Sequence, residues 1–371
     1  VIAKRPNVSL LFLLIPVVMI AAEQIYCYQH YGRSLFANVS DVVTEDRPDR
    51  PLWLWLMIAF SFCGGCTFSV MQIGSVLWNT RLKVLGASIV AAMSCAFYYL
   101  NAHGIRAQTL GCDLPLVSLI FYAIFMMGGT QILSLCTTDI RNRREPESWL
   151  LAFWVFGTFL FTAFVTWSVN VRSLLPLVPA MAILAARRID TITFENPKRA
   201  NRRIVSSLIL SALVSLAVAR SDTTWAQTAR DAATRYAELA KSHPGKTYFQ
   251  GHWGFQHYMQ EAGIQPFDFE TTELKPGDMI VYAQNNANVR PLPDEFIAER
   301  RSEKIPVDRR MATMSTHLGA GFYSDLWGPL PFSLGAKMPP DNYFIDIVAK
   351  PGKPFAEQKS ETPSYQPRSS N

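Results

Sequence analysis

Residues 114–136 have the sequence LPLVSLIFYAIFMMGGTQILSLC, which is 23 residues long and contains no charged side chain. A helix needs roughly 20 apolar residues to cross the hydrocarbon core of a membrane, because only internal hydrogen bonds satisfy the backbone there. We therefore expect a transmembrane helix. The 371-residue chain agrees, since 49% of its residues are hydrophobic and 17% are charged, whereas soluble domains average about 25% charged residues.

Other apolar runs lie on both sides of this stretch. They cover residues 8–26, 52–78, 83–100, 149–170, 172–187 and 204–219. We predict a membrane domain over residues 1–219 with about seven transmembrane helices. The first run follows Lys4 and Arg5, as a signal-peptide core would, but its length and the poor cleavage site Ala21-Ala22-Glu23 favour a retained helix.

Basic residues indicate how these helices are oriented. With the N-terminus inside, 13 Lys and Arg residues lie in the cytoplasmic loops, against five in the opposite loops. The five are Arg33, Arg47, Arg50, Arg106 and Arg172. This positive-inside pattern places residues 220–371 outside the cytoplasm. Because topology accounts for the basic residues, we expect no nucleic-acid partner.

Residues 220–350 have a mixed polar sequence that predicts a small extracytoplasmic α/β domain. An amphipathic helix over 221–242 is followed by the helix stop His243-Pro244-Gly245. A strand at 246–250, a helix at 253–262 and strands at 279–283 and 343–348 then give a βαβ order. The tail 351–371 is rich in Pro, Ser, Lys and Glu and is predicted to be disordered.

The cysteines indicate packing more than chemistry. All six precede residue 137, so residues 220–371 can form no internal disulfide. Cys63 and Cys66 have the spacing of a metal or redox pair, but they flank Gly64-Gly65 within an apolar run. A close contact between two helices is the preferred interpretation. No metal site is predicted.

A short corner between the runs 149–170 and 172–187 contains the candidate residues of the membrane domain. An arginine at the outer end of two helices can point its planar guanidinium at a phosphate in the headgroup plane. We therefore assign Arg172 and Asn170 as candidate phosphate ligands. The alternative is that Arg172 only anchors the corner at the membrane surface.

This corner resembles a known family. The shared pattern is formed by Asn170, Arg172, Leu174, Leu175, Pro176, Pro179 and Ala180. It is similar to the late transmembrane corner of bacterial membrane glycosyltransferases with the C-type fold, a group that includes relatives of protein O-mannosyltransferases and lipid A aminoarabinose transferases. The sequence GHWGFQHYM at 251–259, with Gly263 and the Pro-Gly-Asp at 276–278, resembles the extracytoplasmic tail of uncharacterised members.

The resemblance covers residues 1–350 and implies a bacterial inner (plasma) membrane enzyme that uses a polyprenyl-phosphate-linked sugar as donor. In that family the catalytic carboxylate lies in the first external loop, and several more helices precede the region matched here. The loop 27–51 offers Asp41, Glu45, Asp46 and Asp49, but no family motif matches it. The catalytic base is therefore unknown, and we expect the chain to be the C-terminal portion of a larger enzyme.

The exported domain offers a second group of candidates. His252, Trp253, His257 and Tyr258 are candidate contacts for a sugar or an acceptor, because flat aromatic faces suit carbohydrate C–H surfaces. The alternative is that Trp253, Phe255 and Tyr258 pack the helix on the sheet. His252 and His257 are five positions apart, about 140° around a helix, so the pair does not predict a zinc site.

Together these features predict an α-helical polytopic membrane domain followed by a small α/β extracytoplasmic domain. The expected function is transfer of a sugar from a polyprenyl-phosphate donor to an extracytoplasmic acceptor, with membrane lipids and the lipid-linked sugar as partners. The alternative is a non-catalytic, membrane-anchored binding or assembly protein with an exported recognition domain. A transporter fits less well, because few charges lie within the apolar runs.

We predict that residues 220–371 are exported. A fusion of alkaline phosphatase after Ala219 should be active, because that enzyme needs the oxidising periplasm to form its disulfides. A fluorescent reporter that folds only in the cytoplasm should stay dark at the same position. Bright fluorescence there would show that the orientation is reversed.

Overall fold

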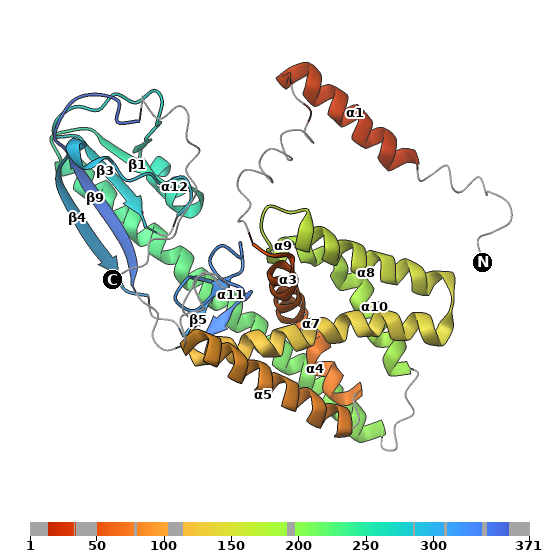
Figure 1. Ribbon diagram of the computed structural model, residues 1–371. Coiled ribbons are helices and arrows are strands. Elements are labelled where there is room, and N and C mark those ends of the chain that lie inside the picture. Colours follow the sequence, from red (N-terminus) through yellow and green to blue (C-terminus); the bar gives the residue numbers. More distant parts are fainter. Residues whose placement is uncertain are drawn as a thin grey trace. The chain divides into compact units, whose positions relative to one another are not determined.

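The computed structural model describes residues 14–32, 34, 50–77, 80–102, 114–190, 197–284, 286–307, 310–335 and 340–355. The chain divides into two compact units (Figure 1). The first, which we call the helical unit, consists of Val1–Ser215 and Thr313–Leu334. The second, which we call the sheet unit, consists of Leu216–Ala312 and Gly335–Asn371.

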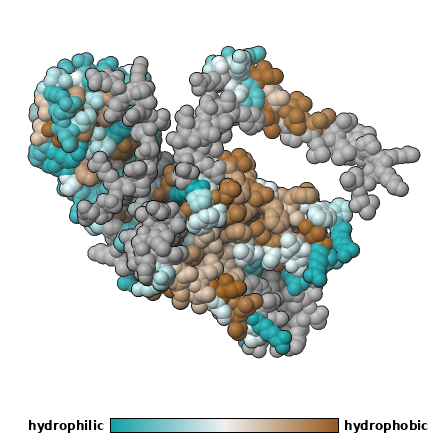
Figure 2. Space-filling view, viewed as in Figure 1, coloured by the Kyte–Doolittle hydropathy of each residue, from teal (hydrophilic) through white to brown (hydrophobic). Residues whose placement is uncertain are grey.

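The helical unit contains most of the apolar sequence. Its described helices are α1 (Leu14–Tyr31), α3 (Leu52–Cys66), α4 (Phe68–Leu77), α5 (Thr80–Ala102), α7 (Leu116–Arg143), α8 (Pro146–Phe164), α9 (Val171–Leu174), α10 (Val178–Asp190) and the first part of α11 (Pro197–Ser242). Within the described residues, α7, α8 and Asn201–Ser242 are long and apolar enough to cross a membrane. Figure 2 shows hydrophobic residues covering much of this unit, which indicates a membrane protein.

The helix bounds differ from the expected ones in several places. The run 172–187 forms α9, a 3₁₀ turn over Leu175–Leu177 and α10 instead of one helix. The run 52–78 is broken at Thr67, whose hydroxyl donates to the carbonyl of Cys63 at 2.6 Å. The run 149–170 is helical only to Phe164, because the chain turns before the corner. The expected helices 204–219 and 221–242 form the single helix α11, since no Gly or Pro interrupts residues 198–242.

Glycines bring α3 and α7 into close contact. A Cβ on Gly64 would overlap the carbonyl oxygen of Phe125, and a Cβ on Gly129 would overlap that of Phe60. Backbones can approach this closely only where both helices have small residues, which is how helices pack when the surrounding lipid is as apolar as their side chains. Cys63 and Cys66 flank Gly64 and Gly65 on α3, so the predicted close contact between two helices is confirmed at this place.

The sheet unit is built on a five-stranded mixed sheet with the order β2-β1-β3-β9-β4. Its strands are β1 (Thr247–Gln250), β2 (Gln265–Pro266), β3 (Met279–Ala283), β4 (Ile297–Ile305) and β9 (Asp341–Val348). β1 is parallel to β3, and α12 (Trp253–Glu261) lies between them in the sequence, which confirms the predicted βαβ order. The short strand β2, which was not predicted, is also parallel to β1. β9 is antiparallel to both β3 and β4.

Both faces of this sheet are covered. One core contains side chains from the second part of α11, from α12 and from one face of the sheet, among them Ala232, Tyr236, Phe255, Met259 and Val281. The other core contains Tyr248, Ile280, Tyr282, Leu292 and Phe296. β3 therefore alternates between the two cores, and all five of its residues are buried. A small α/β unit at the C-terminal side of the helices agrees with the sequence.

Two parts of the predicted domain plan differ from the structure. Residues 313–334, predicted to lie within one domain over 220–350, belong to the helical unit, with the short strands β6 (Met314–Ser315), β7 (Ala320–Gly321) and β8 (Ser333–Leu334). Residues 351–355 were predicted as disordered tail, yet Gly352 pairs with Leu274 and Phe355 is buried. The rest of that tail, 356–371, lies outside the described residues.

The glycine contact gives a test of the helical packing. Gly64→Ala should lower the stability of the detergent-solubilised protein by about 2 kcal/mol or more, because the added methyl group forces α3 and α7 apart. Gly157→Ala in α8 is a matched control, since a Cβ there would meet nothing within 4 Å. A thermal-unfolding midpoint that falls for the control as much as for Gly64→Ala would contradict the assigned contact.

Candidate functional site at the corner between α8 and α9

The segment Thr313–Leu334, which we call the returning segment, packs on one end of the helical unit. The Ser118 hydroxyl at the start of α7 lies 2.9 Å from both the Leu318 carbonyl oxygen and the Ser333 hydroxyl. The Phe332 ring packs edge-on against Phe125, with centroids 5.1 Å apart. We call this end, which also contains the α8–α9 corner, the corner end. The sequence Trp327-Gly-Pro-Leu-Pro-Phe332 is buried there.

Asn170 shapes the corner itself. Its side-chain oxygen accepts hydrogen bonds from the Ser173 backbone N–H at 2.9 Å and from the Ser173 hydroxyl at 3.0 Å. Its amide nitrogen donates to the carbonyl of Ser168 at 3.2 Å. Asn170 therefore acts as the N-cap of α9, a position that Asn favours because it satisfies an otherwise unpaired backbone N–H. Both the oxygen and the nitrogen of its side-chain amide are therefore hydrogen-bonded within the corner.

Asp325 of the returning segment holds this corner in place. Its carboxylate accepts a hydrogen bond from the Val169 N–H at 2.7 Å, and its own N–H donates to the Val169 carbonyl at 2.9 Å. The Val171 N–H donates to the carbonyl of Phe322 at 3.1 Å. Three backbone and side-chain bonds thus join two segments that are about 150 residues apart in the sequence.

The charge of Asp325 is balanced by Arg50. The two side chains form an ion pair in which the carboxylate is fully buried and the guanidinium is 19% exposed. Burial raises the pKa of the Asp325 carboxyl, and the Arg50 guanidinium and the Val169 N–H oppose that rise. The guanidinium also lies over the Trp55 ring at 5.2 Å. Arg50, Trp55 and Asp325 therefore tie α3, the corner and the returning segment together.

Arg172 differs from Arg50 in its surroundings. It lies in α9, two residues beyond the Asn170 cap, and its side chain is exposed. No ion pair or side-chain hydrogen bond joins its guanidinium to any residue that the structure describes. The backbone that carries it is held, because Thr162 in α8 donates to the Ser173 carbonyl at 3.0 Å and Trp154 donates to the Pro176 carbonyl at 2.7 Å. The corner thus presents, from a fixed backbone, a cation without an acidic partner among the described residues.

The candidates of the sheet unit have different environments. His252 is half-buried as the N-cap of α12, and its ring Nδ1 lies 3.1 Å from the Gln256 side-chain oxygen. Trp253 has a φ of 59° and is 53% exposed, so it does not pack the helix on the sheet. His257 is also exposed. Tyr258 packs against the core beside α12, as the structural alternative expected, with the Arg230 guanidinium 5.7 Å from its ring centroid.

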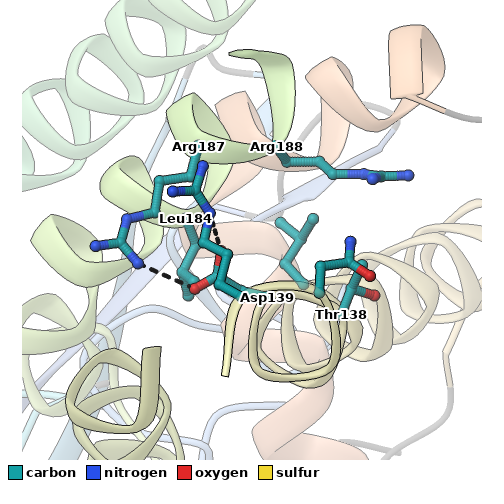
Figure 3. Close-up of a pocket in the computed structure, with 8 residues that line it drawn as sticks. Thr138, Asp139, Leu184, Arg187 and Arg188 are labelled. Atoms are coloured by element: carbon teal, nitrogen blue, oxygen red, sulfur yellow. Dashed lines mark hydrogen bonds and ion pairs between the residues drawn. The ribbon is translucent and has the colours of Figure 1, made fainter. Parts of the chain in front are cut away.

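A second charged cluster lies at the other end of α7, which we call the arginine end. Asp139 forms ion pairs with Arg187 of α10 at 3.1 Å and with Arg143 at 3.4 Å (Figure 3). Arg187 also lies 3.4 Å from the Ser148 hydroxyl of α8. These contacts tie α7, α8 and α10 together around a small pocket of about 10 Å³. The Asp139 carboxylate is shared by the two arginines, and the contacts join three helices, so we assign this cluster a structural role.

Sequence reasoning placed Arg172 and Asn170 at one corner but missed the pair Arg50 and Asp325. Arg50 entered the sequence analysis only as one of the five basic residues in the external loops. Asp325 is a single acidic residue in a loop, and no pattern around it points to a partner. The available clue was the apolar loop at 327–332, whose Trp, Leu and Phe content predicts burial. The predicted loop acids Asp41, Glu45, Asp46 and Asp49 lie outside the described residues.

The chain was compared with known proteins. No protein-family model, no curated protein and no solved structure matches it. Among the described residues, no group of three or more His, Cys, Asp or Glu side chains is placed to hold a metal ion.

The Arg50–Asp325 pair can be tested by a double-mutant cycle. Asp325→Ala should destabilise the detergent-solubilised protein by about 3 to 5 kcal/mol, because it leaves a partly buried guanidinium and the Val169 N–H without their acceptor. Chymotrypsin should then cleave the returning segment at its Phe, Tyr and Trp residues. After Arg50→Ala, the further loss caused by Asp325→Ala should be smaller.

Glu299→Gln is the matched control for this cycle. Glu299 pairs with Arg301 on the exposed strand β4, where water screens the two charges. We expect its unfolding midpoint and cleavage pattern to stay close to those of the unchanged protein. Fully additive losses for Arg50→Ala and Asp325→Ala would show that the two side chains do not interact.

Proposed function

We propose that the chain is a glycosyltransferase, or the C-terminal part of one, that transfers a sugar from a polyprenyl-phosphate donor to an extracytoplasmic acceptor. Arg172 carries the proposal, since it is an exposed arginine without a partner among the described residues on a corner that resembles that family. A guanidinium can bind phosphate through two parallel charge-assisted hydrogen bonds. In the proposed reaction it stabilises the phosphate that leaves the sugar.

The dimensions of the helical unit support a membrane position in which Arg172 faces the outer headgroups. Ser118 at the corner end and Asp139 at the arginine end are 21 positions apart in α7, about 32 Å at 1.5 Å per residue. A hydrocarbon core is roughly 30 Å thick. The two polar ends of the unit are therefore spaced as the two surfaces of a membrane are.

The composition of the two ends agrees with the predicted orientation. The corner end contains Arg50, Leu114 and Val169, which lie in or beside the loops predicted to be outside, and it also contains Asp325 from the part predicted to be exported. The arginine end contains residues predicted to be inside, among them Arg187. The contacts at the two ends were not used in the basic-residue count. They nevertheless group the loops into the same two sets.

The carboxylate at the corner is unsuited to be the catalytic base. Asp325 is fully buried and paired with Arg50, so it cannot reach an acceptor hydroxyl. The base of the proposed enzyme therefore stays unassigned among the described residues. The second candidate is a non-catalytic, membrane-anchored binding or assembly protein with an exported recognition domain, which would hold the lipid-linked sugar without transferring it. The two proposals differ in whether sugar is transferred, and they share Arg172 as the phosphate ligand.

Substitution of Arg172 tests the shared step. The purified protein in detergent, incubated with undecaprenyl phosphate, should retain the lipid, and Arg172→Ala should bind it roughly 10-fold more weakly, because a charge-assisted bond of about 1.5 kcal/mol or more is lost. Arg172→Lys should bind it with an intermediate affinity, since an ammonium lacks the planar fork. Native mass spectrometry of the protein–lipid adduct measures the retained fraction.

Arg141→Ala serves as the control, because Arg141 is also exposed but lies near the arginine end of α7. It should leave retention unchanged. Sugar transfer by membranes containing the unchanged protein, and its loss in Arg172→Ala at equal protein level, would favour the enzyme. Retention without transfer would favour the binding protein, and equal retention by all variants would reject the assigned role of Arg172.

A further inference from the structure

A second basic site lies in the helical unit and shares no residue with the corner end or the arginine end. It is a pocket of about 320 Å³ between α4, α5 and the first part of α11. Figure 1 shows the first turns of α5 and α11 side by side. The residues that line the pocket are Gln72, Lys83, Arg203, Ser206, Ser207 and Leu210. The pocket therefore combines two cations with an amide and two hydroxyl groups.

Neither cation has an acidic neighbour in the part of the chain that the structure describes. None of the described lining residues is acidic, and in the described part of the chain neither Lys83 nor Arg203 forms an ion pair. The Ser206 hydroxyl donates to the Arg203 carbonyl at 2.9 Å. Two positive groups held in one pocket without a counter-ion repel each other, and an anion between them removes that cost.

The surroundings of the pocket are apolar. On α11 the residues Val205, Leu208 and Ile209 are each at least half exposed, and on α5 the same is true of Val84 and Leu85. Only 17% of the most apolar window of α11 is buried within the protein. In a membrane protein such a surface faces acyl chains, so the pocket opens where a lipid tail can lie along the helices and its headgroup can enter.

Lys83 and Arg203 are also among the 13 basic residues that the basic-residue count places on the cytoplasmic side. Basic pockets between helices at that side are suited to anionic headgroups, and anionic lipids give the cytoplasmic leaflet its negative surface potential. A free anion from solution would gain nothing from the exposed leucine and valine side chains. The charge and the apolar surface together favour a lipid.

We propose that this pocket binds the phosphate of an anionic phospholipid in the cytoplasmic leaflet. Lys83 and Arg203 contact the phosphate oxygens, Gln72 and Ser207 supply further hydrogen bonds, and the acyl chains lie on α5 and α11. The proposal is independent of Arg172 and of sugar transfer. A lipid held here links α11 to α4 and α5.

The test uses the full chain in detergent, mixed with phosphatidylglycerol or phosphatidylcholine and examined by native mass spectrometry. The unchanged protein should retain phosphatidylglycerol in preference to phosphatidylcholine. Lys83→Gln combined with Arg203→Gln should bind phosphatidylglycerol about 30-fold more weakly, because each cation near an anionic lipid contributes about fivefold in affinity. Each single variant should show the smaller, fivefold loss, and these variants decide the question if the double variant aggregates.

Arg202→Gln is the matched control, because Arg202 precedes Arg203 on the same helix, is exposed and does not line the pocket. It should retain the lipid as the unchanged protein does. Excess inorganic phosphate should not displace phosphatidylglycerol. A loss in the control equal to that in the variants, displacement by phosphate, or no preference over phosphatidylcholine would each overturn the proposal.

Discussion

The hydrogen bond from the Val169 N–H to the buried carboxylate of Asp325 is the interaction on which the corner end depends. It joins residues that are 156 positions apart, with α11 and most of the sheet unit between them in the sequence. Closing so long a connection is entropically costly, so it persists only where the contact is strong. Burial, the second bond between the same residues and the Arg50 guanidinium supply that strength.

This arrangement makes the sheet unit an insertion in the sequence of the helical unit. The chain leaves the helical unit within α11 and comes back to it as the returning segment. The helix α7 contacts this segment through Ser118 and Phe125. The corner end is therefore completed by residues that follow the insertion in the sequence. The membrane part and the exported part proposed from the sequence therefore cannot be separated at one boundary.

The sequence correctly predicted those elements whose bounds depend on residues that are neighbours in the chain. The Pro-Gly stop at 244–245 ends α11, and the strand at 279–283 has the bounds expected from its apolar run and the turn before it. The contact of the returning segment with the corner was not predicted, because a loop that packs through Gly, Pro and single side chains has no periodicity. Gly328 illustrates the point: a Cβ there would overlap the Gly319 backbone, and only the folded contact requires it. Asp325, likewise, becomes distinctive only when Val169 and Arg50 lie beside it.

The basic residues of the helical unit fall into two groups that sequence alone does not separate. Arg50 and Arg187 lie against buried or nearly buried carboxylates, and their charges are used in holding helices together. Arg172, Lys83 and Arg203 have no such partner among the described residues, and each lies on a helix. A cation that folding leaves unneutralised at a fixed position gains most from an external anion, because no internal bond must break first. Placed at the two surfaces of a membrane, these cations have phosphate as their nearest abundant anion, which connects the proposed donor site and the proposed lipid site through one physical cause.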